Sequence, residues 1–286
     1  MFLQIFVERL SVMRISAAGK QDRILVMSFN SEFSVDDLDG AVSAYDQLGF
    51  VILKNAVSSR ELDTIEDELK EAQDKLINGQ LGDRYGTELL DEPGATFEGE
   101  PFRHYVINCT ELSATALSLA KSRLLTTFAK KVFDGRKAWL NDYARFGVVY
   151  QDARTDEGSK YSRIGWHADY NSDEGSEAWP GFAFTIHIDP TSAANGFLRV
   201  VPGSHKLDKH KDEIGAWAFD HVEGEVPVFA DRGDIILHDY RLWHAAARGT
   251  ADGLSGRRRH VRGSWYAGQP YALDHGIGAF YKNASR

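Results

Sequence analysis

His167 and Asp169 lie two residues apart in the segment Trp166-His-Ala-Asp-Tyr170. If this segment is a β-strand, side chains at i and i+2 leave the same face, so an imidazole and a carboxylate point to one place. A third ligand from a distant histidine, His244, would complete a set of two histidines and one carboxylate. This set occupies one face of an octahedral metal and leaves the other positions open, as in non-haem Fe(II) oxygenases.

A second triplet, His187-Ile-Asp189, competes with the first as a ligand pair. Asp189 directly precedes Pro190, so it is expected where a strand runs into a turn. His167 instead follows a long polar loop over residues 152–162 and enters an aromatic segment. A strand that enters a pocket beside a loop has this pattern, which favours the first triplet.

Composition and charge exclude several classes of protein. The 286 residues are 43% hydrophobic, which is enough for a large core, and the net charge of −9 with no basic stripe argues against nucleic acid as a partner. Cys109 is the only cysteine, so an internal disulfide and a cysteine-ligated zinc site are excluded, and a reducing, cytoplasmic location is expected. No stretch has the length of a membrane span. The oligomeric state is not readable from the sequence.

The first half of the chain is predicted to be mainly helical. Residues 1–30 are expected to be a loose extension, and 31–286 a single domain. Ser34 and the acids after it predict a helix start, with the helix running to Leu48 and stopping at Gly49. A buried strand over 50–54 follows. A second helix, capped by Ser58 or Ser59, is expected to end by Asn78-Gly79. Residues 80–105 are expected to be a long loop, and residues 112–133 are expected to form one or two helices.

From Ala138 onward the pattern changes to short runs of β-branched and aromatic residues separated by turn signals. Some eight strands after a helical first half predict a β-sandwich or jelly roll with helices packed outside. The candidate strands are 146–151, 164–170, 182–188, 197–201, 225–228, 235–238, 243–246 and 260–266.

Several short motifs occur in a fixed order along the chain. They are Gly-Phe-Val-Ile (49–52), Trp-His-Ala-Asp-Tyr (166–170), Asn-Gly-Phe-Leu-Arg-Val-Val-Pro-Gly-Ser-His (195–205), Gly-Asp-Ile-Ile-Leu-His-Asp (233–239), Leu-Trp-His-Ala (242–245) and Arg-Arg-His-Val (258–261). Over roughly residues 35–268 this set resembles the phytanoyl-CoA dioxygenase family of Fe(II)/2-oxoglutarate oxygenases, including its ectoine-hydroxylase branch.

The resemblance implies a double-stranded β-helix core over about 138–268, with the N-terminal helices reaching about residue 137. It also implies Fe(II), 2-oxoglutarate as cosubstrate, and O2. His167, Asp169 and His244 are then the catalytic iron ligands, whereas His238 and His205 are interpreted as structural histidines.

The distal carboxylate of 2-oxoglutarate needs a planar donor fork, which arginine supplies and lysine does not. Relatives place this arginine after the distal histidine, where Arg257, Arg258 and Arg259 stand together. Alignment through Val261 favours Arg258, and Arg259 stays possible. If Arg258 points inward, strand alternation sends Arg257 and Arg259 outward to an exposed face. The long gap after His244 predicts a loop insertion around 249–256.

Further candidates line the expected pocket. Gln151, placed at a strand end, and Thr185 are candidate 2-oxoglutarate contacts, whereas Tyr170, His187 and Arg262 are candidate substrate contacts. Ala246 stands where relatives often have a small hydroxyl residue, so a hydrogen bond to 2-oxoglutarate is expected to be either missing or supplied from elsewhere. His187 could equally support the site from behind or be a satisfied core histidine.

The reaction expected from the resemblance is hydroxylation of an unactivated C–H bond in a small metabolite, with succinate and CO2 as coproducts. Asp169 fills the metal position that halogenating relatives leave open, which favours hydroxylation over halogenation. Desaturation, ring-forming oxidation, a metal enzyme without 2-oxoglutarate and a non-catalytic binding protein remain alternatives. No separate basic cluster suits a coenzyme A phosphate.

Overall fold

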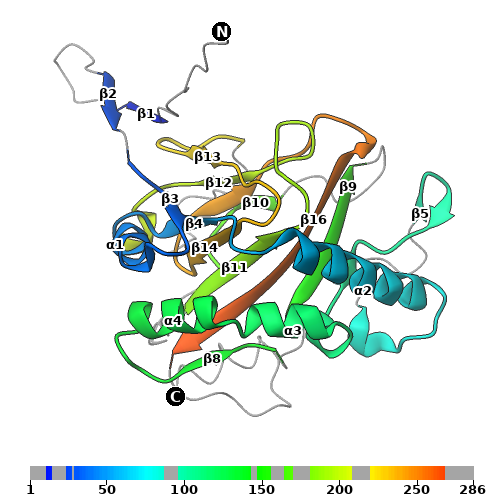
Figure 1. Cartoon of the computed structure of the whole chain (residues 1–286). Coiled ribbons are helices and arrows are strands. Elements are labelled where there is room, and N and C mark those ends of the chain that lie inside the picture. Colours follow the sequence, from blue (N-terminus) through cyan, green and yellow to red (C-terminus); the bar gives the residue numbers. More distant parts are fainter. Residues whose placement is uncertain are drawn as a thin grey trace, which may run out of the picture.

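The computed structural model describes residues 29–86, 96–142, 147–155, 164–169, 181–207 and 220–267, together with the backbone of 11–14 and 24–27. Two β-sheets, made mostly of strands from the second half of the chain, enclose a cavity, and four helices pack on the outside of the larger sheet (Figure 1). This is the predicted double-stranded β-helix.

The larger sheet runs in the order β3-β4-β14-β11-β16-β9-β7, and β8 also pairs with β16. All of its pairs are antiparallel except β3 with β4. The strands are β3 (Glu32–Ser34), β4 (Phe50–Lys54), β7 (Tyr105–Val106), β8 (Ala138–Leu140), β9 (Val149–Thr155), β11 (Gly181–His187), β14 (Ile235–Asp239) and β16 (Gly253–Ala267).

The smaller sheet runs in the order β10-β15-β12-β13 and is antiparallel throughout. Its strands are β10 (Ile164–His167), β12 (Leu198–Val200), β13 (Val226–Val228) and β15 (His244–Ala246). Two separate strand pairs complete the described sheets: β1 (Ser11–Arg14) with β2 (Ile24–Met27), and β5 (Thr96–Phe97) with β6 (Glu100–Pro101).

The four α-helices are α1 (Leu38–Leu48), α2 (Ser59–Ile77), α3 (Ala114–Ala120) and α4 (Arg123–Val132). Three 3₁₀ turns, η1 (Asp83–Tyr85), η2 (Cys109–Glu111) and η3 (Ser204–Lys206), connect other elements. In the part of the chain that the structure describes, no helix is long and apolar enough to cross a bilayer.

Local sequence explains where α1 and α2 begin and end. Gly49 adopts a left-handed conformation (φ 81°) and donates its backbone N–H to Tyr45, which ends α1 at the predicted place. Ser58 and Glu61 form a reciprocal capping box at the start of α2. The predicted cap of α1 was wrong, because the cap is Asp37, three residues after Ser34. The Asp37 side chain accepts from the backbone N–H of Gly40, and α1 begins at Leu38.

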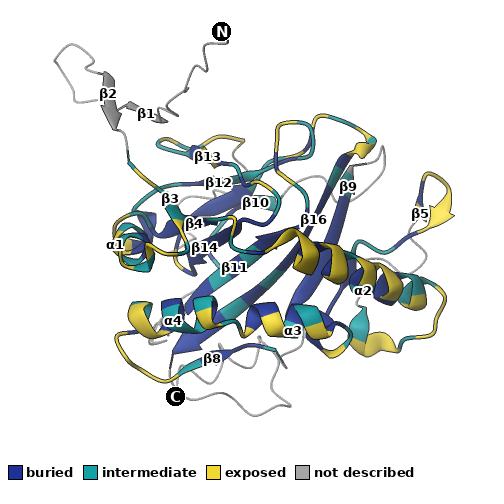
Figure 2. Cartoon of the chain, in the orientation of Figure 1, coloured by how far each residue is buried: buried dark blue, intermediate teal, exposed yellow. Residues whose placement is uncertain are grey.

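Strand alternation divides β11 between the core and the cavity. Phe182, Phe184 and Ile186 are fully buried against the helices, and Phe182 contacts Phe128 of α4 at a ring-centroid distance of 5.2 Å. Burying each such side chain contributes about 1.5–3 kcal/mol. The residues between them line the cavity. Figure 2 shows the result: buried strands behind helices whose exposed residues face away from the sheet.

Three predicted boundaries were wrong. Residues 80–105 are not one loop, since η1, β5, β6 and part of β7 lie there and β7 joins the large sheet. Gln151 is not at a strand end, because β9 continues to Thr155 and pairs with β16. Much of the expected loop insertion over 249–256 is strand, since β16 begins at Gly253.

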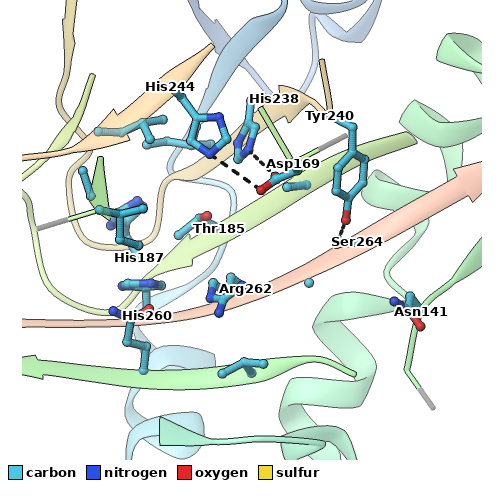
Figure 3. A pocket seen from close by; sticks show the side chains of 18 of the residues that line it. Asn141, Asp169, Thr185, His187, His238, Tyr240, His244, His260, Arg262 and Ser264 are labelled. Atoms are coloured by element: carbon cyan, nitrogen blue, oxygen red, sulfur yellow. Dashed lines mark hydrogen bonds and ion pairs between the residues drawn. The ribbon is translucent and has the colours of Figure 1, made fainter. Parts of the chain in front are cut away.

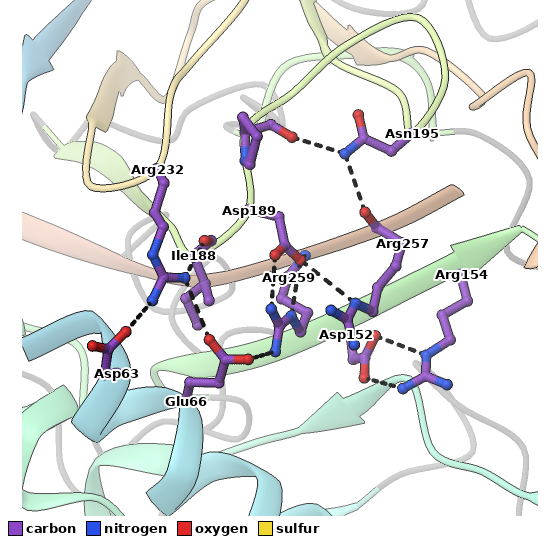
Figure 4. Close-up of polar contacts among 11 residues, drawn as sticks. Asp63, Glu66, Asp152, Arg154, Ile188, Asp189, Asn195, Arg232, Arg257 and Arg259 are labelled. Atoms are coloured by element: carbon purple, nitrogen blue, oxygen red, sulfur yellow. Dashed lines mark hydrogen bonds and ion pairs between the residues drawn. The ribbon is translucent and has the colours of Figure 1, made fainter. Parts of the chain in front are cut away.

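Arg259 is buried rather than exposed, which corrects the expectation for the arginine run. Its guanidinium donates to both carboxylate oxygens of Asp189, at 2.8 Å each, and also bonds Glu66 of α2 (Figure 4). These contacts join β16, the end of β11 and α2. Asp189 lies at the predicted strand end and forms an ion pair with Arg259. It does not line the cavity, whereas His187 does.

We predict that Arg259→Ala lowers the free energy of unfolding by about 3 kcal/mol, because it leaves the partly buried Asp189 without its main cation. Arg257→Ala is the matched control, since Arg257 is one-third exposed and lies 3.9 Å from Asp189. Its effect should stay within about 0.5 kcal/mol. Urea unfolding followed by circular dichroism measures both, and equal stabilities for the two variants would contradict the assignment.

Candidate metal centre and its cavity

The pairing of β10 with β15 brings two of the predicted ligands together. His167 lies directly opposite His244, and Ile164 lies opposite Ala246, with a register shift between the two pairs. Four residues of β10 (164–167) thus lie opposite three of β15 (244–246), which is a bulge of one residue. Without it, Ile164 and His167 would point to opposite faces; with it, both line the cavity.

The backbone fixes the orientation of both imidazoles. His167 Nδ1 lies 2.8 Å from the carbonyl oxygen of Gly165, and His244 Nδ1 lies 2.9 Å from that of Leu242. A carbonyl only accepts, so each Nδ1 carries the proton and each Nε2 presents a free lone pair. The Nε2 atoms lie 3.6 Å and 3.8 Å from Asp169 Oδ1.

Three ligand atoms, one each from His167, Asp169 and His244, lie within 4.8 Å of one another. Two neutral nitrogens and a carboxylate oxygen, converging from one side, match the donors of a facial non-haem iron site. The residues therefore fit the metal that the sequence motif implies.

His238 has a role that the sequence did not reveal. Its Nε2–H donates to Asp169 Oδ2 at 3.2 Å (Figure 3). Asp169 Oδ1 faces the two candidate ligand histidines. Burial alone would raise the pKa of Asp169, but His244, His167 and His238 hold it well below its usual range. His238 therefore orients Asp169, one of the three candidate ligands.

Burial keeps the His244 imidazole neutral, which is the form that can bind a metal. The pKa of His244 falls to about 3, because desolvation disfavours the imidazolium more than Asp169 stabilises it. At His167 burial also acts to lower the pKa, but the hydrogen bond and charge of Asp169 outweigh it and the pKa is raised. Of the two candidate ligand histidines, His167 is therefore the one with the higher pKa and the stronger competition between protons and a metal.

The cavity behind this centre has a volume of about 360 Å³ and opens between the two sheets. That is within the range of small-molecule sites. All three ligands line it, and so do five further predicted site residues; Tyr170 lies outside the described residues. The five are Gln151, Thr185, His187, Arg258 and Arg262.

One end of the cavity is polar, and some of its buried nitrogen atoms have no hydrogen-bond partner among the described residues. Arg258 Nε and His260 Nδ1 are buried, and neither has a hydrogen-bond partner in the described ranges. His260 lies opposite Gln151 on β9 and opposite His187 on β11. Burial, followed by the charge of Arg258, holds the pKa of His260 well below its usual range. A buried arginine without a counter-ion indicates an anion site.

The sequence model of the phytanoyl-CoA dioxygenase family matches residues 45–259. The chain belongs to the phytanoyl-CoA dioxygenase family. All three candidate ligands and Arg258 lie within the matched region. Comparison with curated proteins gives no match.

Solved structures share the fold at low sequence identity. AviO1 from Streptomyces viridochromogenes Tue57 is 20% identical with a TM-score of 0.61, over 82% of this chain and 98% of that one. The non-haem α-ketoglutarate-dependent carbocyclase SnoK from nogalamycin biosynthesis is 18% identical with a TM-score of 0.61, over 88% and 92%. EctD from S. alaskensis with 2-oxoglutarate and 5-hydroxyectoine is 18% identical with a TM-score of 0.59, over 79% and 74%.

The other end of the cavity in this family member holds residues that sequence reasoning missed. Tyr240 donates to Ser264, Tyr266 donates to Tyr240 at 3.0 Å, and the two tyrosine rings stack with centroids 5.1 Å apart. Asn141 lines the same end. Extending the alternation of β16 past Ser264 would have found Tyr266. Tyr240 and Asn141 lie outside the strands that were predicted, so no periodic signal marks them.

We predict that His167→Ala, Asp169→Ala and His244→Ala each lose most bound iron, because a set of three ligands has none to spare. His238→Ala should keep the site but bind Fe(II) roughly tenfold more weakly, since it removes only the group that orients Asp169. Metal analysis after equilibrium dialysis against Fe(II) gives both results. Full iron in any of the first three variants would overturn the ligand assignment, as would loss of iron in His238→Ala with retention in His244→Ala.

Proposed function

We propose that this protein is an Fe(II)- and 2-oxoglutarate-dependent dioxygenase that hydroxylates an unactivated C–H bond of a small metabolite or natural-product intermediate. One observation carries the proposal: a two-histidine, one-carboxylate centre and an uncompensated buried arginine line the same cavity. The first suits Fe(II), and the second suits the distal carboxylate of a cosubstrate that reaches the metal. A cavity of about 360 Å³ supports a small molecule as substrate.

Iron, 2-oxoglutarate and O2 together would supply the oxidation: one oxygen atom enters the substrate, and the other enters succinate as CO2 is released. The protein holds the reactants in place. His167 Nε2, His244 Nε2 and Asp169 Oδ1 would bind the metal. His238 keeps Asp169 turned towards it, and burial excludes bulk water from His244, which is 7% exposed.

Arg258 would hold the distal carboxylate of 2-oxoglutarate. An anion in a buried cavity is costly unless it is paired, and a guanidinium offers two parallel donors. Gln151 and Thr185 line the same cavity and would contact the cosubstrate chain. Ala246 also lines it but has no hydroxyl to donate, which makes the arginine the principal anchor.

Hydroxylation is one of several outcomes that such a centre supports. SnoK is described as a carbocyclase, and EctD was solved with 5-hydroxyectoine, so the shared fold serves different reactions. Asp169 occupies a metal position, which supports oxygen transfer over halide transfer. Product mass separates the outcomes, because hydroxylation adds one oxygen atom whereas desaturation or ring closure removes two hydrogen atoms.

Succinate release tests the proposal. Purified protein with Fe(II), 2-oxoglutarate and O2 is screened against small metabolites, and succinate and product masses are measured. We expect one compound class to accelerate succinate formation in step with a product that gains oxygen. Asp169→Ala is the control and should form no succinate above background. No turnover of 2-oxoglutarate with or without any compound would contradict the proposal.

We predict that Arg258→Ala raises the 2-oxoglutarate concentration for half-maximal turnover by about two orders of magnitude, since losing a charged hydrogen-bonded pair costs about 3 kcal/mol. Arg258→Lys should recover only part of this, because an ammonium cannot form the two-pronged contact. Arg257→Ala, which changes a residue outside the cavity lining, is the control. A normal 2-oxoglutarate requirement in Arg258→Ala would remove the arginine from this role.

A further inference from the structure

Arg262 is a second cavity arginine whose charge has no counterpart. It lines the cavity, and it forms no ion pair or hydrogen bond with any residue in the described ranges. Several other arginines among the described residues differ, because they lie close to a carboxylate. Examples are Arg84 with Glu111, Arg154 with Asp152, Arg199 with Glu225, Arg232 with Asp63 and Arg259 with Asp189.

Arg262 lies nearer to the metal centre than Arg258 along β16. It pairs in register with Thr185 of β11 and Val149 of β9, and both of these line the cavity. Figure 3 shows its side chain beside Thr185, between His260 and Asp169. The two arginines are four positions apart on the strand, which places their Cα atoms roughly 13 Å apart. The two guanidiniums therefore lie at different depths in the cavity.

The charges of the loaded cavity leave Arg262 unbalanced. Among the described residues that line it, Asp169 is the only acidic one, and Arg258 and Arg262 are the arginines. Fe(II), Asp169, Arg258 and the dianion of 2-oxoglutarate together sum to zero. The lining histidines can add only positive charge. One positive charge, that of Arg262, thus remains beside the metal, and a partly desolvated cation of this kind favours an anionic ligand.

We propose that the primary substrate carries a carboxylate or phosphate group, and that Arg262 binds this group and so positions the substrate at the metal. This inference rests on the proposed Fe(II)/2-oxoglutarate function. The body of the substrate extends towards the end formed by Tyr240, Ser264 and Tyr266, where the lining residues are neutral and aromatic. A carboxylate and a phosphate both fit a guanidinium fork, and the test separates them.

Calorimetric titration of the Fe(II)-loaded protein without O2 tests the inference in two stages. The first titrant is 2-oxoglutarate. The second, added to the 2-oxoglutarate complex, is a panel of aliphatic and aromatic carboxylates and monophosphates, each beside its neutral amide or alcohol. We expect at least one acid to bind tenfold or more tightly than its neutral counterpart, and the preferred series identifies the anion.

Arg262→Gln should remove this preference and weaken the acid at least tenfold, while 2-oxoglutarate affinity changes less than twofold; Arg262→Lys should keep part of the preference. Arg257→Gln is the matched control and should leave both titrations unchanged. Unfolding midpoints verify that each variant is folded.

Two results overturn the inference alone: no acid binds better than its neutral counterpart, or Arg262→Gln weakens 2-oxoglutarate as strongly as Arg258→Gln does. The second result would assign Arg262 to the cosubstrate. Failure of 2-oxoglutarate to bind the wild-type protein in the first stage would instead overturn the proposed function.

Discussion

The bulged register between β10 and β15 is the constraint on which the candidate centre depends. It sets His167 opposite His244 and turns both towards the cavity, while backbone carbonyls of Gly165 and Leu242 leave each Nε2 free. Asp169 then lies between the two candidate ligand histidines and the supporting His238. A shift of one residue in this register would send His167 to the opposite face of the strand.

The larger sheet supplies the rest of the site by the same alternation. On β16, Arg258 and Arg262 face the cavity, whereas Arg259 between them faces α2 and is neutralised by Asp189 and Glu66. The same chemical group thus contributes to stability on one face and, in the proposed function, to ligand binding on the other. Burial does not distinguish the two faces, since Arg258 and Arg259 are equally buried. The difference is that Arg259 has carboxylates within reach and Arg258 has none among the described residues.

Signals that are local in sequence predicted the fold well, and contacts between distant segments were harder to predict. Gly49 and Ser58 marked helix ends correctly, and the alternating second half predicted the two-sheet core. The bulge between Ile164 and His167 has no periodic signature, so the spacing suggested a ligand pair without the register that completes it. Arg259 looked exposed because its partner Glu66 lies far away in sequence. His238 looked structural because its acceptor, Asp169, is contributed by another segment.

The central claim is that one cavity holds Fe(II) and 2-oxoglutarate together. A 2-oxo acid that chelates Fe(II) produces a charge-transfer band in the visible spectrum, so the most direct test is anaerobic titration of the Fe(II)-loaded protein with 2-oxoglutarate. The account predicts a band that saturates at an equimolar amount of 2-oxoglutarate in the wild type and is absent from Asp169→Ala. A wild-type protein that binds iron but develops no such band at saturating 2-oxoglutarate would contradict it.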